Sequence, residues 1–246
     1  MTEYDAPING NNKDEQAYQA LKHKILTLEY PPGMLLREIE LSEDLSMSRT
    51  PVRAAIARLI SDGFVEEIGP RRNIVSDVSV VSFMNIYQVR EVLENLCISL
   101  AAYSWQDPSE LQPLRQLLIE QSALTQTSPV ESRAFLETDR KFHWLLAKLS
   151  RNDLLIREIM RVYELYWRYN FYSMHRSRPN QIVQEHAAIL EALDSRDKVL
   201  AQACMKDHLS QTKDDILIGL AKGFRPADEL KRKKRGYFLK EDAAIL

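Results

Sequence analysis

The sequence predicts a mainly α-helical protein of two domains, and three observations support this fold class. The chain has 246 residues, enough for one or two domains of roughly 150 residues each. Only seven residues are glycine, too few for the frequent tight turns of an all-β fold. Residues 15–78 form short segments interrupted by proline and glycine, whereas residues 79–221 have no glycine before Gly219 and show the spacing of long amphipathic helices. We therefore expect a small N-terminal domain over 15–78 and an all-helical domain over 79–221, between a flexible tail over 1–14 and a basic tail over 222–246.

Composition and charge exclude several classes of protein. Hydrophobic residues are 45% and charged residues 28% of the chain, the balance of a soluble globular protein. No apolar run approaches a membrane span of about 18 residues, and the N-terminus has no signal-peptide core. The two cysteines, Cys97 and Cys204, rule out a disulfide framework and a cysteine-based zinc site, so a reducing cytoplasm is the expected setting. The net charge of −2 argues against a generally basic nucleic-acid-binding surface but leaves room for a local basic face.

The N-terminal domain begins with two predicted helices. Apolar residues recur every three or four positions over 15–28, which indicates a first helix. The run Pro31-Pro32-Gly33 ends it. Apolar positions between 39 and 45 then indicate a short second helix.

A third helix and a hairpin complete this domain. Ser48 or Thr50 can cap the helix with Pro51 in its first turn, and Asp62-Gly63 ends it. Alternating apolar residues on both sides of the basic turn at 70–73 predict two short strands. Helix, helix, turn, helix and hairpin together make the layout of a winged helix-turn-helix.

This layout predicts DNA binding through the third helix, whose N-terminal residues would enter the major groove. The set facing the groove would be Arg49, Thr50 and Arg53, because arginine is the commonest bidentate partner of guanine and threonine can contact a phosphate or a thymine methyl. Arg71 and Arg72 in the turn of the hairpin are placed for phosphates or the minor groove. The alternative is a small helical interaction module whose arginines are solvated.

The charge of residues 1–78 limits how such a domain binds DNA. Nine of these residues are basic and thirteen are acidic, so the segment carries a net charge of −4. Positive charge is concentrated in the third helix and the hairpin, and non-specific affinity for DNA should be weak. We accordingly expect a homodimer that reads a palindromic operator on double-stranded DNA.

Four sequence runs resemble the DNA-binding domain of the GntR family of bacterial transcription regulators. They are Tyr30-Pro31-Pro32-Gly33-Met34-Leu35, Glu40-Leu41-Ser42, Ser48-Arg49-Thr50-Pro51-Val52-Arg53 and the run from Leu59 to Gly63. The resemblance implies DNA binding, with Arg49, Thr50 and Arg53 as the contacts of the recognition helix.

Three positions differ from the usual family pattern. Ala54 stands in place of a glutamate, and Ile39 in place of an arginine that contacts DNA in some members. Arg72 stands where the wing usually has a glycine, so Asn73 or Arg71 would have to supply the positive φ of that turn.

The second domain is predicted to contain six helices, over 79–105, 109–127, 131–150, 153–174, 179–195 and 197–221. Proline marks three of the starts, at Pro108, Pro129 and Pro179, and short polar runs mark two others. In the first helix an aliphatic stripe is expected to face the core: Val89, Val92, Leu93, Leu96 and Leu100.

Three of the five histidines fall at core-facing positions of three different helices. His143 lies four residues after Asp139, so both side chains project from one helix face. His186 and His208 lie on two later helices. One aspartate and three histidines suit a divalent ion such as Zn²⁺, Ni²⁺, Mn²⁺ or Fe²⁺. The alternative is that each histidine forms hydrogen bonds within the core or faces solvent.

Residues 82–219 resemble the FCD ligand-binding domain of the FadR subfamily. The matching pattern is Asp-x-x-x-His at 139–143, Glu-His-x-x-Ile-Leu-x-Ala-Leu at 185–193, and a last histidine before leucine at 208–209. The resemblance implies a divalent ion, expected to be zinc with nickel or manganese as alternatives, held by Asp139, His143, His186 and His208. His23 and His175 match no motif.

The resemblance also implies a small carboxylate effector at the open coordination positions, with an arginine completing the charge match. Arg90 occupies the arginine position of the family's first FCD helix, and Arg168, in an aromatic-rich helix, is the second candidate. For Arg90 the alternative is a helical i,i+4 ion pair with Glu94.

A metal-containing helical domain joined to a DNA-binding module could also be an enzyme that acts on a small carboxylate. No general base is evident beside the four ligands, since helical geometry directs Glu137 and Glu185 away from the ligands next to them. We therefore predict a transcription regulator without enzymatic activity, a repressor controlled by its effector. The basic run at 231–235 is expected to be solvated, with a supplementary DNA contact as the alternative.

Overall fold

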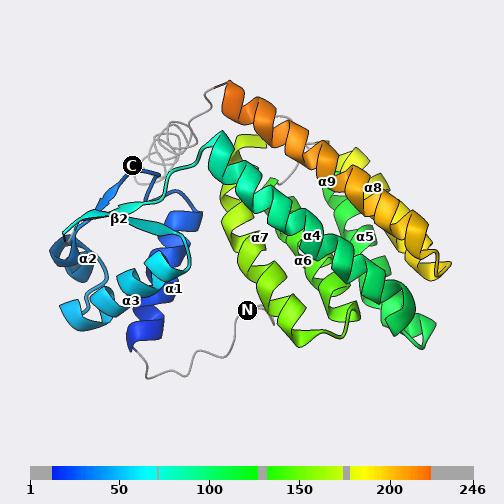
Figure 1. Ribbon diagram of the computed structural model, residues 1–246, viewed down its shortest axis with the longest axis horizontal. Coiled ribbons are helices and arrows are strands. Elements are labelled where there is room, and N and C mark those ends of the chain that lie inside the picture. The colour runs from blue at the N-terminus through cyan, green and yellow to red at the C-terminus, as the bar shows by residue number, and fades with distance from the viewer. Residues whose placement is uncertain (1–12, 71, 127–131, 174–177, 223–246) are drawn as a thin grey trace, which may run out of the picture. The chain divides into compact units, whose positions relative to one another are not determined.

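The computed structural model describes residues 13–70, 72–126, 132–173 and 178–222. Contacts divide the chain into two compact units, with the boundary between Val78 and Ser79. Helices dominate both units, and the strands that the structure describes belong to the N-terminal unit (Figure 1). The predicted mainly α fold class is confirmed. No helix in the described ranges combines the length and apolarity needed to span a bilayer.

The N-terminal unit has the predicted winged-helix layout. In chain order its elements are α1 (Lys13–Leu26), β1 (Leu35–Leu36), α2 (Glu38–Asp44), α3 (Arg49–Ser61), β2 (Val65–Gly69) and β3 (Arg72–Val75). Helix α1 packs against α3, and the apolar faces of both helices are fully buried, including Leu21 and Ile25 on α1 and Val52 and Leu59 on α3. Ser48 is the N-cap residue of α3 and Asp62 the C-cap residue, so the helix begins and ends where the sequence indicated, but the Ser48 side chain makes no capping hydrogen bond.

The wing is a three-stranded antiparallel sheet in the order β1-β3-β2. Strand β1 was not predicted, because its two residues carry no local pattern and are held by pairing with β3, where Leu35 lies opposite Ile74. The expectation for Asn73 was wrong, since this residue lies within β3 opposite Glu67. Gly69, at the end of β2, takes the positive φ of +156° instead. Arg71 lies outside the described residues.

The C-terminal unit contains six α-helices and one 3-10 helix among its described residues. These are α4 (Val80–Ser104), η1 (Pro108–Leu111), α5 (Gln112–Thr125), α6 (Ser132–Leu149), α7 (Asp153–Ser173), α8 (Pro179–Asp194) and α9 (Lys198–Ala221). Capping side chains account for several of the starts: Ser79 accepts a hydrogen bond from the backbone N–H of Ser82, and Asp197 accepts one from Leu200. Helix α4 packs against α6, α7 and α9 (Figure 1).

The stripe expected to form the core face of α4 was partly wrong. Val89, Val92 and Leu96 are exposed, whereas the buried face of the helix includes Phe83 and Ile98. Apolar residues occur around most of this helix, so periodicity alone does not identify the buried face.

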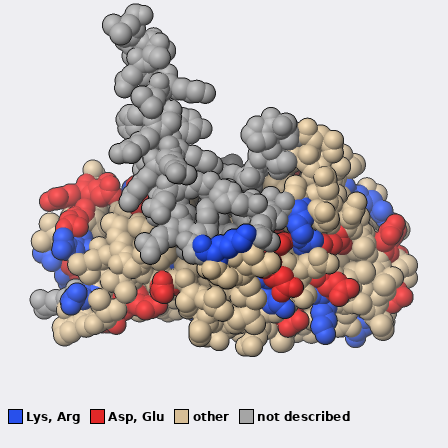
Figure 2. Space-filling view, turned by 90° about the horizontal axis from the view of Figure 1, so that it is seen from above, with Lys and Arg blue, Asp and Glu red and all other residues tan. Residues whose placement is uncertain are grey.

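On the face of the C-terminal unit seen in Figure 2, acidic and basic side chains are interspersed, in keeping with the small net charge of the chain.

Candidate functional site

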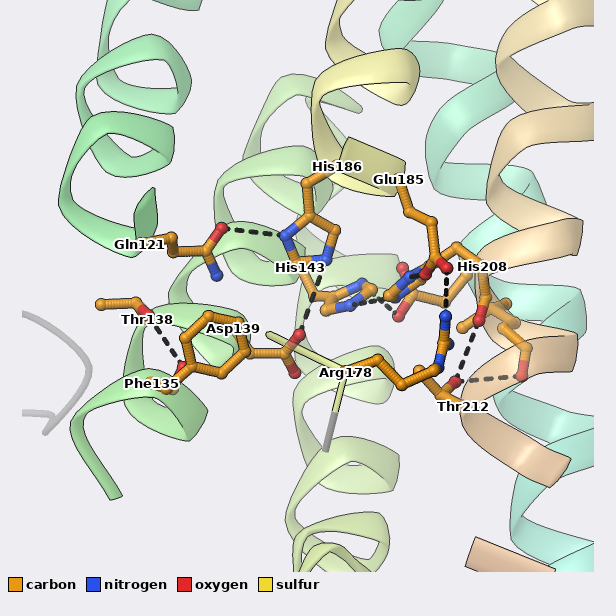
Figure 3. A network of polar contacts seen from close by, with 12 residues as sticks. Gln121, Phe135, Thr138, Asp139, His143, Arg178, Glu185, His186, His208 and Thr212 are labelled. Carbon is orange, nitrogen blue, oxygen red and sulfur yellow. Dashed lines mark hydrogen bonds and ion pairs between the residues drawn. The ribbon is translucent and has the colours of Figure 1, made fainter. Parts of the chain in front are cut away.

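Four side chains from three helices converge in the core of the C-terminal unit. Asp139 and His143 project from α6, His186 from α8 and His208 from α9, and all four are buried. One ligand atom from each lies within 4.8 Å of the other three. The structure thus brings together the four residues that the sequence singled out (Figure 3).

Each imidazole has an oxygen from another helix beside its Nδ1 atom. His143 Nδ1 lies 2.8 Å from Glu94 Oε1, and His208 Nδ1 lies 2.8 Å from Glu185 Oε2. His186 Nδ1 lies 3.0 Å from Gln121 Oε1. These contacts orient the rings so that the Nε2 atoms face one another, with those of His143 and His208 separated by 3.3 Å (Figure 3).

The donor set fits a divalent cation. Burial, then the charges of His208 and His143, holds the pKa of His186 well below its ordinary value, so this ring is neutral. Its Nε2 atom is buried without a hydrogen bond to any described residue and lies 3.5 Å from Asp139 Oδ1. Neutral imidazole nitrogens and a carboxylate oxygen are the ligands that zinc and similar metals accept. Partners that orient such ligands from behind are typical of metal sites.

Tyr163 holds the aspartate of this cluster. Its hydroxyl donates a hydrogen bond to Asp139 Oδ2, which leaves Oδ1 facing His186. Burial, and next the charge of Asp139, raises the pKa of Tyr163, so the phenol remains a donor at neutral pH. Phe142 stacks on the ring of His186 with centroids 3.8 Å apart and forms an apolar wall.

Arg90 makes the pair with Glu94 that the sequence offered as the alternative, and it also contacts His143 of the cluster. Its Nε atom donates to Glu94 Oε1 at 3.2 Å, which is the helical i,i+4 pair. Its Nη2 atom lies 3.1 Å from His143 Nε2, so the guanidinium also reaches the cluster. Burial by itself would raise the pKa of Glu94, but His143 and Arg90 outweigh burial and lower it to about 2. The guanidinium also lies over the ring of Tyr166, 4.1 Å from its centroid.

Glu185 contacts a proposed ligand on another helix, which the sequence did not predict. It does project away from His186, its neighbour on α8, but it reaches His208 on the adjacent α9. Arg178 then pairs with Glu185 at 2.6 Å and with Asp215 on α9 at 2.8 Å. Gln121 and Tyr163 were also missed, because no sequence signal links them to histidine or aspartate residues on other helices.

The remaining residues that the sequence named occupy different environments. Arg168 on α7 is buried. His23 is exposed on α1, and His175 and the basic run at 231–235 lie outside the described residues.

The predicted DNA-binding residues that the structure describes are exposed on the N-terminal unit. Arg49, Thr50 and Arg53 are exposed in the first turns of α3, and Arg72 is exposed at the start of β3. Arg49 and Arg53 both contact the carboxylate of Glu38 on α2, a partner that the sequence did not reveal.

Comparison with known families identifies both units. Residues 13–72 match the model of bacterial regulatory proteins of the GntR family, and residues 85–211 match the FCD domain. The chain therefore belongs to the GntR family of bacterial transcription regulators and carries a C-terminal FCD domain.

Individual relatives agree with this assignment. The chain is 26% identical over 211 residues to the HTH-type transcriptional repressor RspR of Escherichia coli K12, covering 85% of this chain and 89% of the relative. It is 28% identical over 212 residues to an HTH-type transcriptional regulator of Streptomyces ambofaciens, covering 86% and 88%. Both relatives are named as transcriptional regulators, not as enzymes. The structure of Escherichia coli McbR/YncC shares the fold, with a TM-score of 0.70, 24% identity and coverage of 86% of this chain and 99% of that one. The protein is a DNA-binding transcription regulator.

Proposed function

We propose that this regulator is an effector-responsive repressor whose FCD domain binds a divalent metal ion and a small carboxylate. The observation that carries the proposal is the convergence of four donor atoms within 4.8 Å in a buried core. Burying three imidazoles and a carboxylate side by side is costly unless a cation binds them. The proposed ligands are Asp139, His143, His186 and His208.

Zinc is the proposed ion, with nickel and manganese as alternatives, because three imidazole nitrogens and one carboxylate oxygen suit these metals. A bound ion would supply a positively charged centre that a carboxylate can coordinate. Glu94, Gln121 and Glu185 would keep the three imidazoles in place, since each already lies against an Nδ1 atom.

The buried charges favour an anionic effector. At the cluster itself a divalent ion and Arg90 would bring three positive charges, Asp139 and Glu94 bring two negative charges, and Glu185 is paired with Arg178. One positive charge then remains in a core where charges interact strongly, and a carboxylate balances it. Arg90 is the proposed effector-binding arginine because it already reaches the cluster through His143, and Arg168 is the second candidate.

For operator recognition we propose that Arg49, Thr50 and Arg53 contact base edges in the major groove. Arg71 and Arg72 of the wing would contact phosphates or the minor groove. The exposure of the α3 residues supports this assignment.

We propose a homodimer with α4 as part of the interface. Exposed apolar side chains follow one face of this helix: Val81, Val89, Val92, Leu96 and Tyr103, between 44% and 71% exposed. An unpaired apolar stripe of this length is typical of an interface, and a two-fold protein matches a palindromic operator. Val92→Glu should shift the native mass from dimer to monomer.

One experiment tests the metal and the dimer together: native mass spectrometry with elemental analysis of the full-length protein. We expect a dimer with one divalent ion per chain in the wild type and in His23→Ala, and loss of the ion in His186→Ala. Gel shifts with a panel of small carboxylates then test whether operator affinity responds in the wild type and not in His186→Ala. A wild-type protein without a divalent ion, purified from metal-supplemented cells, would overturn the metal site.

A further inference from the structure

Glu38, the first residue of α2, forms hydrogen bonds with the two arginines at the start of α3. Its Oε1 accepts a hydrogen bond from Arg53 Nε at 2.9 Å, and its Oε2 accepts one from Arg53 Nη2 at 2.8 Å. Arg49 Nη2 donates to the same Oε2 at 3.1 Å. One carboxylate thus accepts three hydrogen bonds from the two arginines assigned to the major groove.

This arrangement leaves each arginine able to contact a base. A guanidinium has five N–H donors in a planar fork. Arg53 uses Nε and one hydrogen of Nη2 on Glu38, so its Nη1 and the other Nη2 hydrogen form a second edge that can pair with guanine O6 and N7. Arg49 donates to Glu38 through Nη2 alone, which leaves its Nε and Nη1 donors for other partners on DNA.

The surroundings place Glu38 within the predicted DNA-binding surface. Glu38, Arg49 and Arg53 line one hollow together with Ile39 on α2 and the wing residue Asn73. The hydrogen bonds and charge of Arg53, together with those of Arg49, outweigh the opposing effect of burial and lower the pKa of Glu38 to about 2, so the carboxylate is ionised. An ionised carboxylate on this surface repels DNA phosphates and weakens binding to any sequence.

We propose that Glu38 is a positioning and specificity residue for operator recognition, an inference that rests on the proposed reading of DNA by Arg49 and Arg53. It holds both guanidinium groups in the orientation that pairs with guanine, and its negative charge lowers affinity for arbitrary DNA. The positioning of the guanidinium groups increases the ratio of specific to non-specific binding, whereas the charge lowers affinity for every sequence. A structural ion pair at the surface would leave this ratio unchanged.

Glu40 provides a matched control for the charge. It lies on the same helix, two residues away, and pairs with Arg37 at 2.6 Å. Glu40→Gln removes the same single charge without touching either α3 arginine. Glu38→Asp provides the complementary test, because it keeps the charge but shortens the side chain by one methylene.

The experiment compares the dissociation constants for two duplexes of equal length at two salt concentrations. One duplex is selected from a randomised pool by the full-length wild-type protein, and the other is its scrambled sequence. We expect Glu38→Gln to reduce the selectivity ratio about 10-fold and to tighten binding to the scrambled duplex, as loss of one ordered bidentate contact predicts. Glu38→Asp should reduce the ratio without tightening non-specific binding, and Glu40→Gln should change both affinities alike.

A selectivity ratio in Glu38→Gln within about twofold of the wild type would overturn the inference, as would an equal loss in Glu40→Gln. The variant Arg53→Ala distinguishes failure of the inference about Glu38 from failure of the proposed base contacts. If Arg53→Ala keeps the wild-type ratio, the assignment of Arg53 to the bases is wrong. If Arg53→Ala lowers the selectivity ratio while Glu38→Gln retains the wild-type ratio, only the proposed role of Glu38 is wrong.

Discussion

Each unit of the molecule contains an arginine–glutamate pair at its candidate functional site, and the two pairs differ mainly in exposure. Arg53 and Glu38 in the N-terminal unit are 68% and 25% exposed and lie 2.8 Å apart. Arg90 and Glu94 in the C-terminal unit are 2% and 0% exposed and lie 3.2 Å apart. An exposed pair contributes about 0–1 kcal/mol to stability, whereas removing one partner of a buried pair costs about 3–5 kcal/mol.

The difference indicates how each unit can act. Arg53 can exchange part of its contact with Glu38 for a contact with a DNA base at little cost in free energy. The contacts of the predicted DNA-binding surface are therefore replaceable. Arg90 cannot leave Glu94 without stranding a charge in the core, so the cluster around His143 is fixed before any ligand binds. A site whose side chains are already fixed in the binding geometry loses less conformational entropy when a ligand binds.

The largest expected effect is the loss of the buried pair. Glu94→Gln should lower the free energy of unfolding of the C-terminal unit by about 3–5 kcal/mol, because Arg90 remains buried without its counter-charge. Urea unfolding followed by tryptophan fluorescence measures this unit specifically, since Trp105, Trp144 and Trp167 all belong to it. The measurement is made with a chelator so that metal binding does not contribute.

Glu38→Gln serves as the exposed counterpart of this test. It should change the stability of the N-terminal unit by no more than about 1 kcal/mol, as measured by circular dichroism. Equal losses in the two variants would mean that exposure does not distinguish the pairs.

Removal of a metal ligand should have the next largest effect. An ion present at about 100 times its dissociation constant stabilises the fold by about 2.7 kcal/mol, so a chelator should lower the melting temperature of the wild type. In His143→Ala, His186→Ala and His208→Ala a chelator should have no further effect, because one of three nitrogen ligands is gone.

The control for this series is His23→Ala, since His23 is exposed on α1 in the other unit. It should keep the wild-type response to chelator. A chelator response retained in all three ligand variants would contradict the site.

Much of the fold could be predicted because its signals are local. Proline, capping residues and apolar spacing act within a few residues, and the predicted bounds of α6, α7, α8 and α9 agree with the structure to within one residue. Strand β1 and the buried face of α4 depend on pairing and packing with distant segments, which a single sequence does not encode locally.

The residues of the candidate site likewise differ in whether a local sequence signal predicts them. The spacing of Asp139 and His143 predicts a shared helix face, whereas His186 and His208 were candidates only because they occupy core-facing positions, and the family resemblance alone tied them to the same site. Gln121 lies 65 residues from His186, and Glu185 contacts a histidine on another helix. Residue spacing within one helix therefore cannot predict either contact. Glu38 was missed for the same reason, since it lies 15 residues from Arg53.

A smaller effect is expected from the exposed arginines on DNA. Arg53→Ala should weaken operator binding by about 1–3 kcal/mol and relax the base preference at one position, because a bidentate base contact is lost. Arg72→Ala should instead weaken binding to all sequences and reduce the slope of log affinity against log salt by about one. Gel-shift titrations at several salt concentrations measure both, and the same salt slope for the two variants would contradict the assignment.

The smallest expected effect is the acid titration of Glu38, which isolates the exposed pair. Its folded-state pKa of about 2 lies below the ordinary value of 4.5, so the ionised carboxylate is the stabilising form. This small contribution is present above pH 4.5 and is lost as the pH falls through about 2. NMR titration of the carboxyl carbon, assigned by its absence in Glu38→Gln, should follow this transition in the wild type. Arg53→Ala should raise the pKa of Glu38 more than Arg49→Ala does, because Arg53 donates two hydrogen bonds to the carboxylate and Arg49 donates one. A midpoint near 4.5 in the wild type would mean that the pair is open in solution, and Arg53 would then reach DNA without help from α2.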